Sequence, residues 1–263
     1  MPSIDLDGFL ALFAGTRSVA LVGNAETVLD YASGERIDDH DVVVRFNRAF
    51  TDGIEDKVGR RTDILVANRT YNLAKAPSPA TTVKPRCVVC FVEPGRDIDL
   101  SAFRAWVGDL PTWITLAPDL VKAGAVERMR PVTMGTNALY ALTHLLAVRE
   151  LFLTGFGFYG AAGHGHGVYW QEDRKSRGVF HDLEEEARLF VNILQRFDGA
   201  VEATPEVEAL IARFGGRGSG AKGAGAGNGV GEFEARLGWR LIRWGMRLRR
   251  RAELRAGRQL DKP

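Results

Sequence analysis

The sequence predicts an α/β domain in which a mostly parallel sheet is sandwiched by helices. Three observations favour this fold class. Short, valine-rich apolar runs alternate with longer segments of helical periodicity. Three of these runs are followed by glycine or asparagine, at the strand ends where ligands bind in such sheets. The composition, 45% hydrophobic and 26% charged, is ordinary for a globular protein.

Four apolar runs predict buried strands, at residues 19–22, 42–46, 87–92 and 151–154. Two further segments predict helices. Residues 136–148 form the clearer one, and residues 181–197 place their leucines, Phe190 and Ile193 on one side. Because strands and helices alternate, we expect the strands to pair in parallel within one domain of residues 1–214.

A change of composition follows this domain. Residues 215–231 are rich in glycine and predict a flexible linker, and residues 232–258 predict a basic amphipathic helix. From residue 232 to the last residue, ten Lys or Arg stand against four acidic residues, whereas the rest of the chain is mildly acidic. Such a helix suits an anionic membrane surface. Docking on the acidic body is the alternative, and nucleic acid is disfavoured because the body offers no basic groove.

The two cysteines, Cys87 and Cys90, form a CxxC pattern. A redox pair or half of a zinc site would fit this spacing, but no second cysteine pair exists and the flanking residues read as a strand. We therefore expect both to be core residues. No run reaches the length of a membrane span, and the first residues lack a signal-peptide pattern, so we expect a cytoplasmic protein.

The first strand leads into a turn with a single glycine, Gly23, followed by Asn24. A dinucleotide-binding turn needs further glycines and an acidic residue after the next strand, and neither is present. The turn can still present a backbone amide and the Asn24 side chain to a phosphate at a helix start. A strand-to-helix turn with Asn24 as a cap is the alternative. Asn47 ends the second strand in a similar way.

Two later segments also favour an anion site. Thr133, Gly135 and Thr136 open the helix of residues 136–148, where hydroxyl and amide groups meet the positive end of the helix dipole. An ordinary N-cap is the alternative. Gly155, Phe156 and Gly157 follow the fourth strand, so they fall at the same edge of the predicted sheet.

Acidic and histidine residues suggest metal or proton-transfer chemistry at three places. Asp39, His40 and Asp41 match the letters of a DxD metal motif, but they precede a strand and so favour a polar turn. His164 and His166 lie in a glycine-rich loop without a convincing third ligand, so we expect no metal site. His181 precedes an acidic helix start, and it is either a cap or surface residue or a general base.

These segments, in this order, resemble glycosyltransferase family 29, the eukaryotic-type sialyltransferases. The family's large sialylmotif begins with a strand ending in VGN and continues close to IDxHDxVxRxNxA. The chain matches it with Val22, Gly23, Asn24, Ile37, Asp38, His40, Asp41, Val43, Arg45, Asn47 and Ala49. The small motif resembles residues 131–157, motif III resembles residues 168–171, and the very small motif matches His181 and Glu186. The resemblance covers about residues 17–197 and is that of a bacterial-like cytoplasmic member.

The resemblance implies a Rossmann-like, GT-A-like catalytic domain. It also implies an inverting, metal-independent transfer of sialic acid, or a related nonulosonic acid, from its CMP donor to a glycan hydroxyl, without a cofactor. His181 is then the general base, and Glu186 has an orienting or structural role. The expected CMP-binding residues are Gly23, Asn24, Asn47, Thr133, Gly135, Thr136, Gly155, Phe156, Gly157 and Tyr169.

The chain departs from the family pattern at several points. Val19 stands where animal members have a cysteine that joins two motifs, which fits a reducing compartment. One extra residue in the small motif leaves open whether Thr133 or Thr136 contacts the phosphate. The basic helix is expected to replace the missing N-terminal anchor, at the inner face of the cell membrane, with a lipid-linked or lipopolysaccharide-type acceptor. A CMP-Kdo-dependent transferase and a non-catalytic nucleotide-binding or membrane-scaffold protein are the alternatives.

Overall fold

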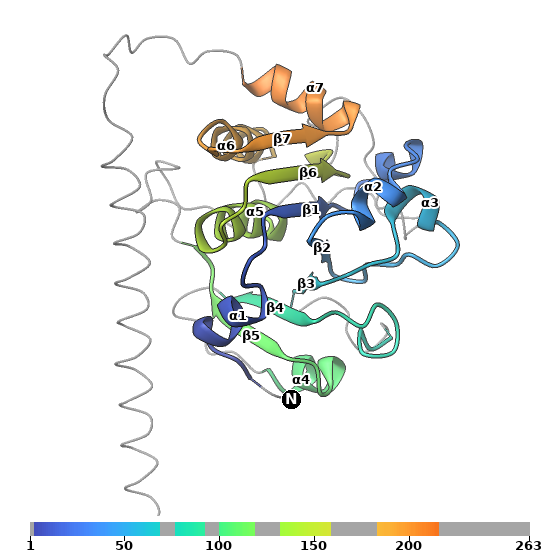
Figure 1. The fold of residues 1–263 in the computed structure, drawn as a ribbon, viewed down its shortest axis with the longest axis vertical. Helices are drawn as coiled ribbons and strands as arrows, with labels where there is room; N and C mark the ends of the chain where they lie inside the picture. Colours follow the sequence, from blue (N-terminus) through green and yellow to red (C-terminus); the bar gives the residue numbers. More distant parts are fainter. Residues whose placement is uncertain (1–2, 69–76, 93–99, 119–131, 159–182, 216–263) are drawn as a thin grey trace, which may run out of the picture. The chain divides into compact units, whose positions relative to one another are not determined.

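A computed structural model describes residues 3–68, 77–92, 100–118, 132–158 and 183–215 of the chain. Its centre is a seven-stranded sheet in which every neighbouring pair of strands is parallel, in the order β5-β4-β3-β2-β1-β6-β7 (Figure 1). The strands are β1 (Ser18–Val22), β2 (Val42–Phe46), β3 (Ile64–Val66), β4 (Cys87–Val92), β5 (Thr112–Leu116), β6 (Glu150–Thr154) and β7 (Ala200–Ala203).

Helices lie on both faces of this sheet. They are α1 (Leu6–Leu12), the 3-10 helix η1 (Glu26–Asp30), α2 (Gly34–Asp38), α3 (Glu55–Val58), α4 (Ser101–Val107), α5 (Met134–Leu145), α6 (Leu183–Gln195) and α7 (Pro205–Phe214). Residues of η1, α2, α3 and α4 pack on side chains of one face, among them Ala20, Val43 and Val88. Trp113 of β5 pairs with Val89, the neighbour of Val88 in β4, so its side chain lies on the opposite face. The ring of Phe9 in α1 stacks on the Trp113 ring there, with 4.5 Å between the ring centroids.

The predicted fold class is confirmed, and the sheet is parallel throughout its described strands. All four predicted strands are present, within one residue at each end. The predicted helices are α5, which begins two residues earlier than expected, and α6. Three strands were not predicted: β3 has only three residues, β5 follows Pro111 and includes two threonines and a tryptophan, and β7 is an edge strand with a partly exposed Ala-Val-Glu-Ala sequence. Apolar runs of four or more residues miss strands of these kinds.

The order of the strands creates a switch point beside β1. The chain passes from β1 through β5 in one direction and then returns to place β6 and β7 on the other side of β1. In open parallel sheets of this kind, ligands bind outside the carboxyl ends of the strands at such a switch point. The residues that follow β1, β2 and β6 therefore lie at the edge where a site is expected.

The acidic residues before β2 lie at the opposite, amino-terminal edge. The Asp41 carboxylate accepts hydrogen bonds from the backbone amides of Arg17 and Ser18, at 2.8 and 3.0 Å, and these bonds lower its pKa. Asp38 accepts from the amides of Arg60 and Arg61. These bonds agree with the predicted polar turn. No cluster of three metal-binding side chains occurs among the described residues.

Arg45 is a buried cation inside this fold. Its side chain, 1% exposed, extends from β2 and donates a hydrogen bond from Nε to the Arg61 carbonyl at 2.8 Å. A second nitrogen donates to the Val58 carbonyl at the end of α3. Arg45 therefore joins β2 to the segment between α3 and β3, and its bonds serve the fold.

Both cysteines are free and buried in β4, as expected for core residues. Burial raises the pKa of the Cys87 thiol to about 12. Because the thiolate is the reactive form, we expect the native protein to resist iodoacetamide at pH 8, and protein unfolded in urea to label at both positions. Mass spectrometry of alkylated peptides measures this. Rapid labelling of Cys87 in the native protein would contradict its place in the core.

None of the helices in the described part of the chain is both long enough and apolar enough to cross a bilayer. The linker from residue 216 onwards and the basic helix at 232–258 lie outside the described residues. Their boundaries, like the more specific GT-A-like assignment, stay predictions.

Candidate functional site

Two glycines bring the carboxyl ends of β1 and β6 together. Gly23 directly follows β1 and donates its amide to the Thr154 carbonyl at 2.7 Å. Gly155 directly follows β6 with a φ of 73°, in the left-handed region that favours glycine. A Cβ added at Gly23 would lie 2.1 Å from the Gly155 carbonyl oxygen, so only a glycine fits there. The single glycine after β1 therefore serves a close contact between the ends of two strands.

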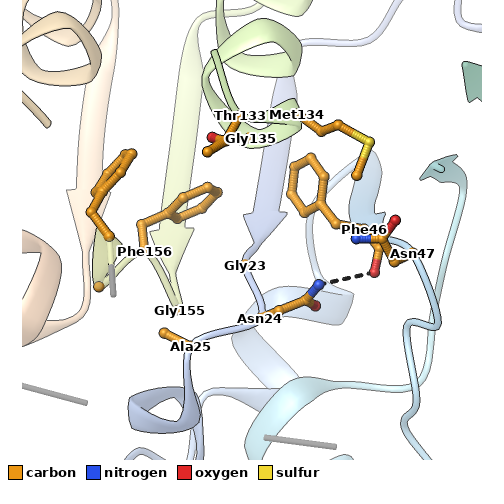
Figure 2. A pocket seen from close by; sticks show the side chains of 12 residues that line it. Gly23, Asn24, Ala25, Phe46, Asn47, Thr133, Met134, Gly135, Gly155 and Phe156 are labelled. Carbon is orange, nitrogen blue, oxygen red and sulfur yellow. Dashed lines mark hydrogen bonds between the residues drawn. The ribbon is translucent and has the colours of Figure 1, made fainter. Parts of the chain in front are cut away.

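Asn24 joins the end of β1 to the end of β2. Its side-chain amide donates to the Phe46 carbonyl at 3.2 Å, as the dashed line in Figure 2 shows. Asn47 follows Phe46 with a φ of 58°, a conformation that asparagine tolerates better than most residues. Its side-chain oxygen accepts from the Asn68 amide at 3.2 Å. The two asparagines thus follow neighbouring strands and line one pocket.

The start of α5 forms a third side of this pocket. Thr133 is the N-cap, and Met134 and Gly135 open the helix above the ends of β1 and β2 (Figure 2). The first amides of a helix have no acceptor within it, so they can bind an anion or a polar ligand group. A Cβ at Gly135 would lie 2.8 Å from the Phe156 ring, so this glycine lets the ring pack closely against the helix start.

Glu186 holds the start of α5 from behind. This residue of α6 is buried, and its Oε1 accepts from the Thr133 amide at 2.8 Å and from the Thr136 hydroxyl at 2.9 Å. Thr136 is itself fully buried and is not among the residues that line the pocket. Of the two threonines that the sequence left open for the phosphate, the geometry favours Thr133, which lines the pocket, whereas Thr136 bonds to Glu186.

The pocket has a cavity volume of about 140 Å³ and lies at the switch point. It is lined by Gly23, Asn24, Ala25, Phe46, Asn47, Thr133, Met134, Gly135, Gly155, Phe156, Gly157 and Phe158. These residues offer amide and hydroxyl groups beside aromatic rings, and none of them carries a charged side chain. The aromatic rings of such a lining can pack against a flat ring of a ligand. Its amide and hydroxyl groups can form hydrogen bonds to a polar group that is neutral or carries a single charge.

The structure brings together eight of the predicted CMP-binding residues: Gly23, Asn24, Asn47, Thr133, Gly135, Gly155, Phe156 and Gly157. Tyr169, His181, His164 and His166 lie outside the described residues, so the proposed base and the tyrosine stay predictions.

One buried residue beside the site was missed in the sequence. Glu206, 3% exposed, lies in the first turn of α7, and its Oε1 accepts from the Gly155 amide at 2.9 Å. The sequence indicates it only through the segment Thr204-Pro205-Glu206, which is typical of a helix start. The strand before it, β7, is short and partly exposed and does not form an apolar run.

The fold and the pocket define an α/β protein of the doubly wound kind, whose ligands bind at the carboxyl ends of the strands. Within it, residues 14–100 match the family model of glycosyltransferase family 29 (sialyltransferase). This segment is therefore similar to glycosyltransferase family 29, and the predicted resemblance is confirmed. The matched residues include Gly23, Asn24 and Asn47.

Curated relatives match a short part of the chain. The chain is 48% identical over 54 residues to the human β-galactoside α-2,6-sialyltransferase 2, which is 20% of this chain and 10% of that protein. It is 45% identical over 51 residues to a β-1,6-galactosyltransferase of Arabidopsis thaliana, covering 19% and 13% of the two chains. The chain thus spans about a tenth of the length of these relatives.

The fold itself is similar over a larger part of the chain. A solved structure of a mammalian sialyltransferase superposes with a TM-score of 0.52 and 19% identity, covering 73% of this chain and 72% of that one. A second structure, a mammalian sialyltransferase in complex with Gal-beta-1-3GalNAc-ortho-nitrophenol, gives a TM-score of 0.51 and 20% identity over 72% and 69%. At this level of identity the likeness concerns the fold.

Proposed function

We propose that this protein is a glycosyltransferase that transfers sialic acid, or a related nonulosonic acid, from a CMP-activated donor to a glycan hydroxyl. The observation that carries the proposal is the meeting of Asn24, Asn47 and the start of α5 in one pocket, with both asparagines supplied by the segment that matches family 29. The proposed acceptor is a lipid-linked or lipopolysaccharide-type glycan.

The lining suits a leaving group of one phosphate. The Asn24 amide has two N–H groups, one of which bonds to Phe46, and the other can donate to a phosphate oxygen. The first amides of α5 can donate to the same phosphate. Such fixed donors stabilise the negative charge that develops on the phosphate as the bond to the sugar breaks. The aromatic rings of the pocket offer a surface for the cytosine ring.

Three parts of the mechanism are proposals that rest on the family resemblance. The transfer is inverting, His181 removes the proton from the acceptor hydroxyl, and no metal ion takes part. Replacing His181 with alanine is expected to abolish transfer while leaving CMP binding intact. Full transfer activity in that variant would refute the assignment of the base. Loss of activity in EDTA would refute metal independence.

The donor is the least constrained part of the proposal, because the relatives include a galactosyltransferase as well as sialyltransferases. Hydrolysis of a panel of activated sugars, without an acceptor, tests donor class and catalytic competence together. The panel contains CMP-sialic acid, CMP-Kdo and UDP-galactose, each with and without EDTA. We expect turnover of CMP-sialic acid. Preference for CMP-Kdo would support the alternative donor, and turnover of none would favour a nucleotide-binding protein without activity.

The position of Asn24 in the pocket predicts that it contributes to CMP binding. Replacing it with aspartate keeps the shape but adds a negative charge and removes the donor to Phe46. We expect binding of CMP to weaken about tenfold or more, because charge repulsion and a lost hydrogen bond together exceed about 1.4 kcal/mol. The matched control is Asn192→Asp, which makes the same change at an exposed position of α6. Calorimetric titration with CMP measures both, and equal affinities in the two variants would remove Asn24 from the site.

The tail carries a separate proposal. We propose that residues 232–258 bind the anionic inner face of the cell membrane and hold the enzyme near a lipid-linked acceptor, because they combine nine arginines with an apolar stripe. Co-sedimentation with vesicles of mixed neutral and anionic lipids tests it, comparing the full chain with a chain ending at residue 215. Equal pelleting of the two would refute membrane binding by the tail.

A further inference from the structure

We propose that Glu206 is a positioning residue of the pocket, which sets the turn after β6 by holding the Gly155 amide. This inference rests on the proposed function for its ligand, but the position of the turn can be measured without one. Glu206 is not among the residues that line the pocket, and it acts through Gly155, which does.

The Gly155 amide needs a side-chain acceptor because the pairing of β6 with β7 ends before this residue. β7 pairs with β6 only as far as Leu153, which lies opposite Ala203, and at Thr204 the chain enters α7. Gly155 therefore lies beyond the end of the ladder, where no carbonyl of β7 is opposite its amide. A buried amide without an acceptor costs about 1–3 kcal/mol. The Glu206 carboxylate supplies that acceptor at 2.9 Å.

Both polar backbone groups of Gly155 are then held. Its amide donates to Glu206, and its carbonyl accepts from the Ala25 amide at 3.0 Å. Beside Ala25, the Asn24 side chain donates to Phe46, and the Asn47 amide donates to the Val66 carbonyl at 2.9 Å. A row of hydrogen bonds thus crosses the carboxyl edge from α7 to β3. Glu206 fixes its end beside β6.

The hydrogen bonds of Glu206 distinguish it from an acidic residue that only stabilises the start of a helix. Glu208 lies in the same first turn of α7 and is exposed, and both acids interact favourably with the helix dipole. Glu206 alone turns inward. Its Oε1 accepts from Gly155 and from the Thr204 hydroxyl at 2.6 Å, and burial together with the charge of Glu206 raises the pKa of the nearby Tyr31.

Two substitutions of Glu206 distinguish the effect of side-chain length from the effect of the negative charge. Glu206→Gln keeps the length and an acceptor oxygen but removes the charge, whereas Glu206→Asp keeps the charge and shortens the side chain by one methylene. A positioning role predicts that CMP affinity falls about tenfold in the Asp variant and stays within about threefold in the Gln variant. A role in the helix dipole predicts the reverse order, which would overturn the inference.

Two controls and a second readout complete the experiment. Glu208→Asp should leave CMP affinity unchanged. Thr204→Val removes the other hydrogen bond to the same oxygen, and it measures the effect of lost stability alone. Amide hydrogen exchange, without any nucleotide, should show faster exchange at residues 155–158 in Glu206→Asp, by about tenfold, than in Glu206→Gln or Thr204→Val.

The two readouts have different consequences. If wild-type protein binds no CMP, the proposed function fails, and hydrogen exchange still decides the role of Glu206. If exchange at residues 155–158 is the same in all four variants, Glu206 does not position this turn, whatever the protein binds.

Discussion

Replacing Gly23 with alanine is expected to destabilise the protein by about 3 kcal/mol and to abolish measurable CMP binding. The new Cβ would lie 2.1 Å from the Gly155 carbonyl oxygen and 2.6 Å from its carbon, and both are backbone atoms that cannot rotate away. The ends of β1 and β6 must separate, which is the costly form of overpacking. For a domain of about 200 residues the fall in Tm is roughly 6–12 °C.

Gly108→Ala is the matched control, because it distinguishes the cost of a steric clash from the cost of backbone strain. Gly108 ends α4 with a φ of 66°, and a Cβ there would meet no atom within 4 Å. Its replacement should cost about 1–2 kcal/mol through backbone strain alone and leave CMP binding unchanged. Thermal unfolding and CMP titration measure both variants. A Gly23→Ala protein that binds CMP as tightly as Gly108→Ala would show that the contact between Gly23 and Gly155 does not shape the pocket.

Replacing Arg45 with methionine is expected to lower the free energy of unfolding by about 3 kcal/mol. The change leaves the buried Val58 carbonyl and the partly buried Arg61 carbonyl without the donors that Arg45 supplies, and an unsatisfied buried group costs about 1–3 kcal/mol. Methionine recovers part of the packing, and it removes the cost of burying a charge. Urea unfolding followed by circular dichroism measures the loss.

The control for Arg45 is Arg60→Met. The Arg60 side chain is exposed, and its hydrogen bonds to Asp38 come from the backbone amide, so the change should stay within about 0.5 kcal/mol. In the cold, where both variants are folded, CMP should bind to Arg45→Met with nearly normal affinity, in contrast to Gly23→Ala. Loss of CMP binding by folded Arg45→Met would mean that this cation reaches the ligand.

These two predictions show what the sequence could and could not specify. The motif that carries the resemblance contains Gly23, Asn24, Asp41, Arg45 and Asn47 in one ordered row, but the pattern does not say which residues meet a ligand. The structure divides them by the edge of the sheet. Gly23 and both asparagines follow strands and line the pocket, whereas Asp41 and Arg45 hold backbone groups elsewhere.

Long apolar runs made the central strands predictable, because a strand buried on both faces is apolar at every position. The same rule failed for β3, β5 and β7, which are short, polar in part or exposed at an edge. The supports of the pocket were unpredictable for a different reason. Thr133 and Glu186 are 53 residues apart, and Gly155 and Glu206 are 51 residues apart, so no local pattern connects them. Glu186 was singled out by its motif, without its partners.

Because of the two buried glutamates, Glu186 and Glu206, the pocket depends on helices from the end of the domain as well as on its own lining residues. Every described lining residue precedes residue 159, but Glu186 and Glu206 come from α6 and α7, near the end of the described chain. A ribosome must therefore release nearly the whole domain before the start of α5 and the turn after β6 acquire their acceptors. The segment that matches the family model therefore cannot form this pocket alone, and a fragment intended to form it must extend through α7.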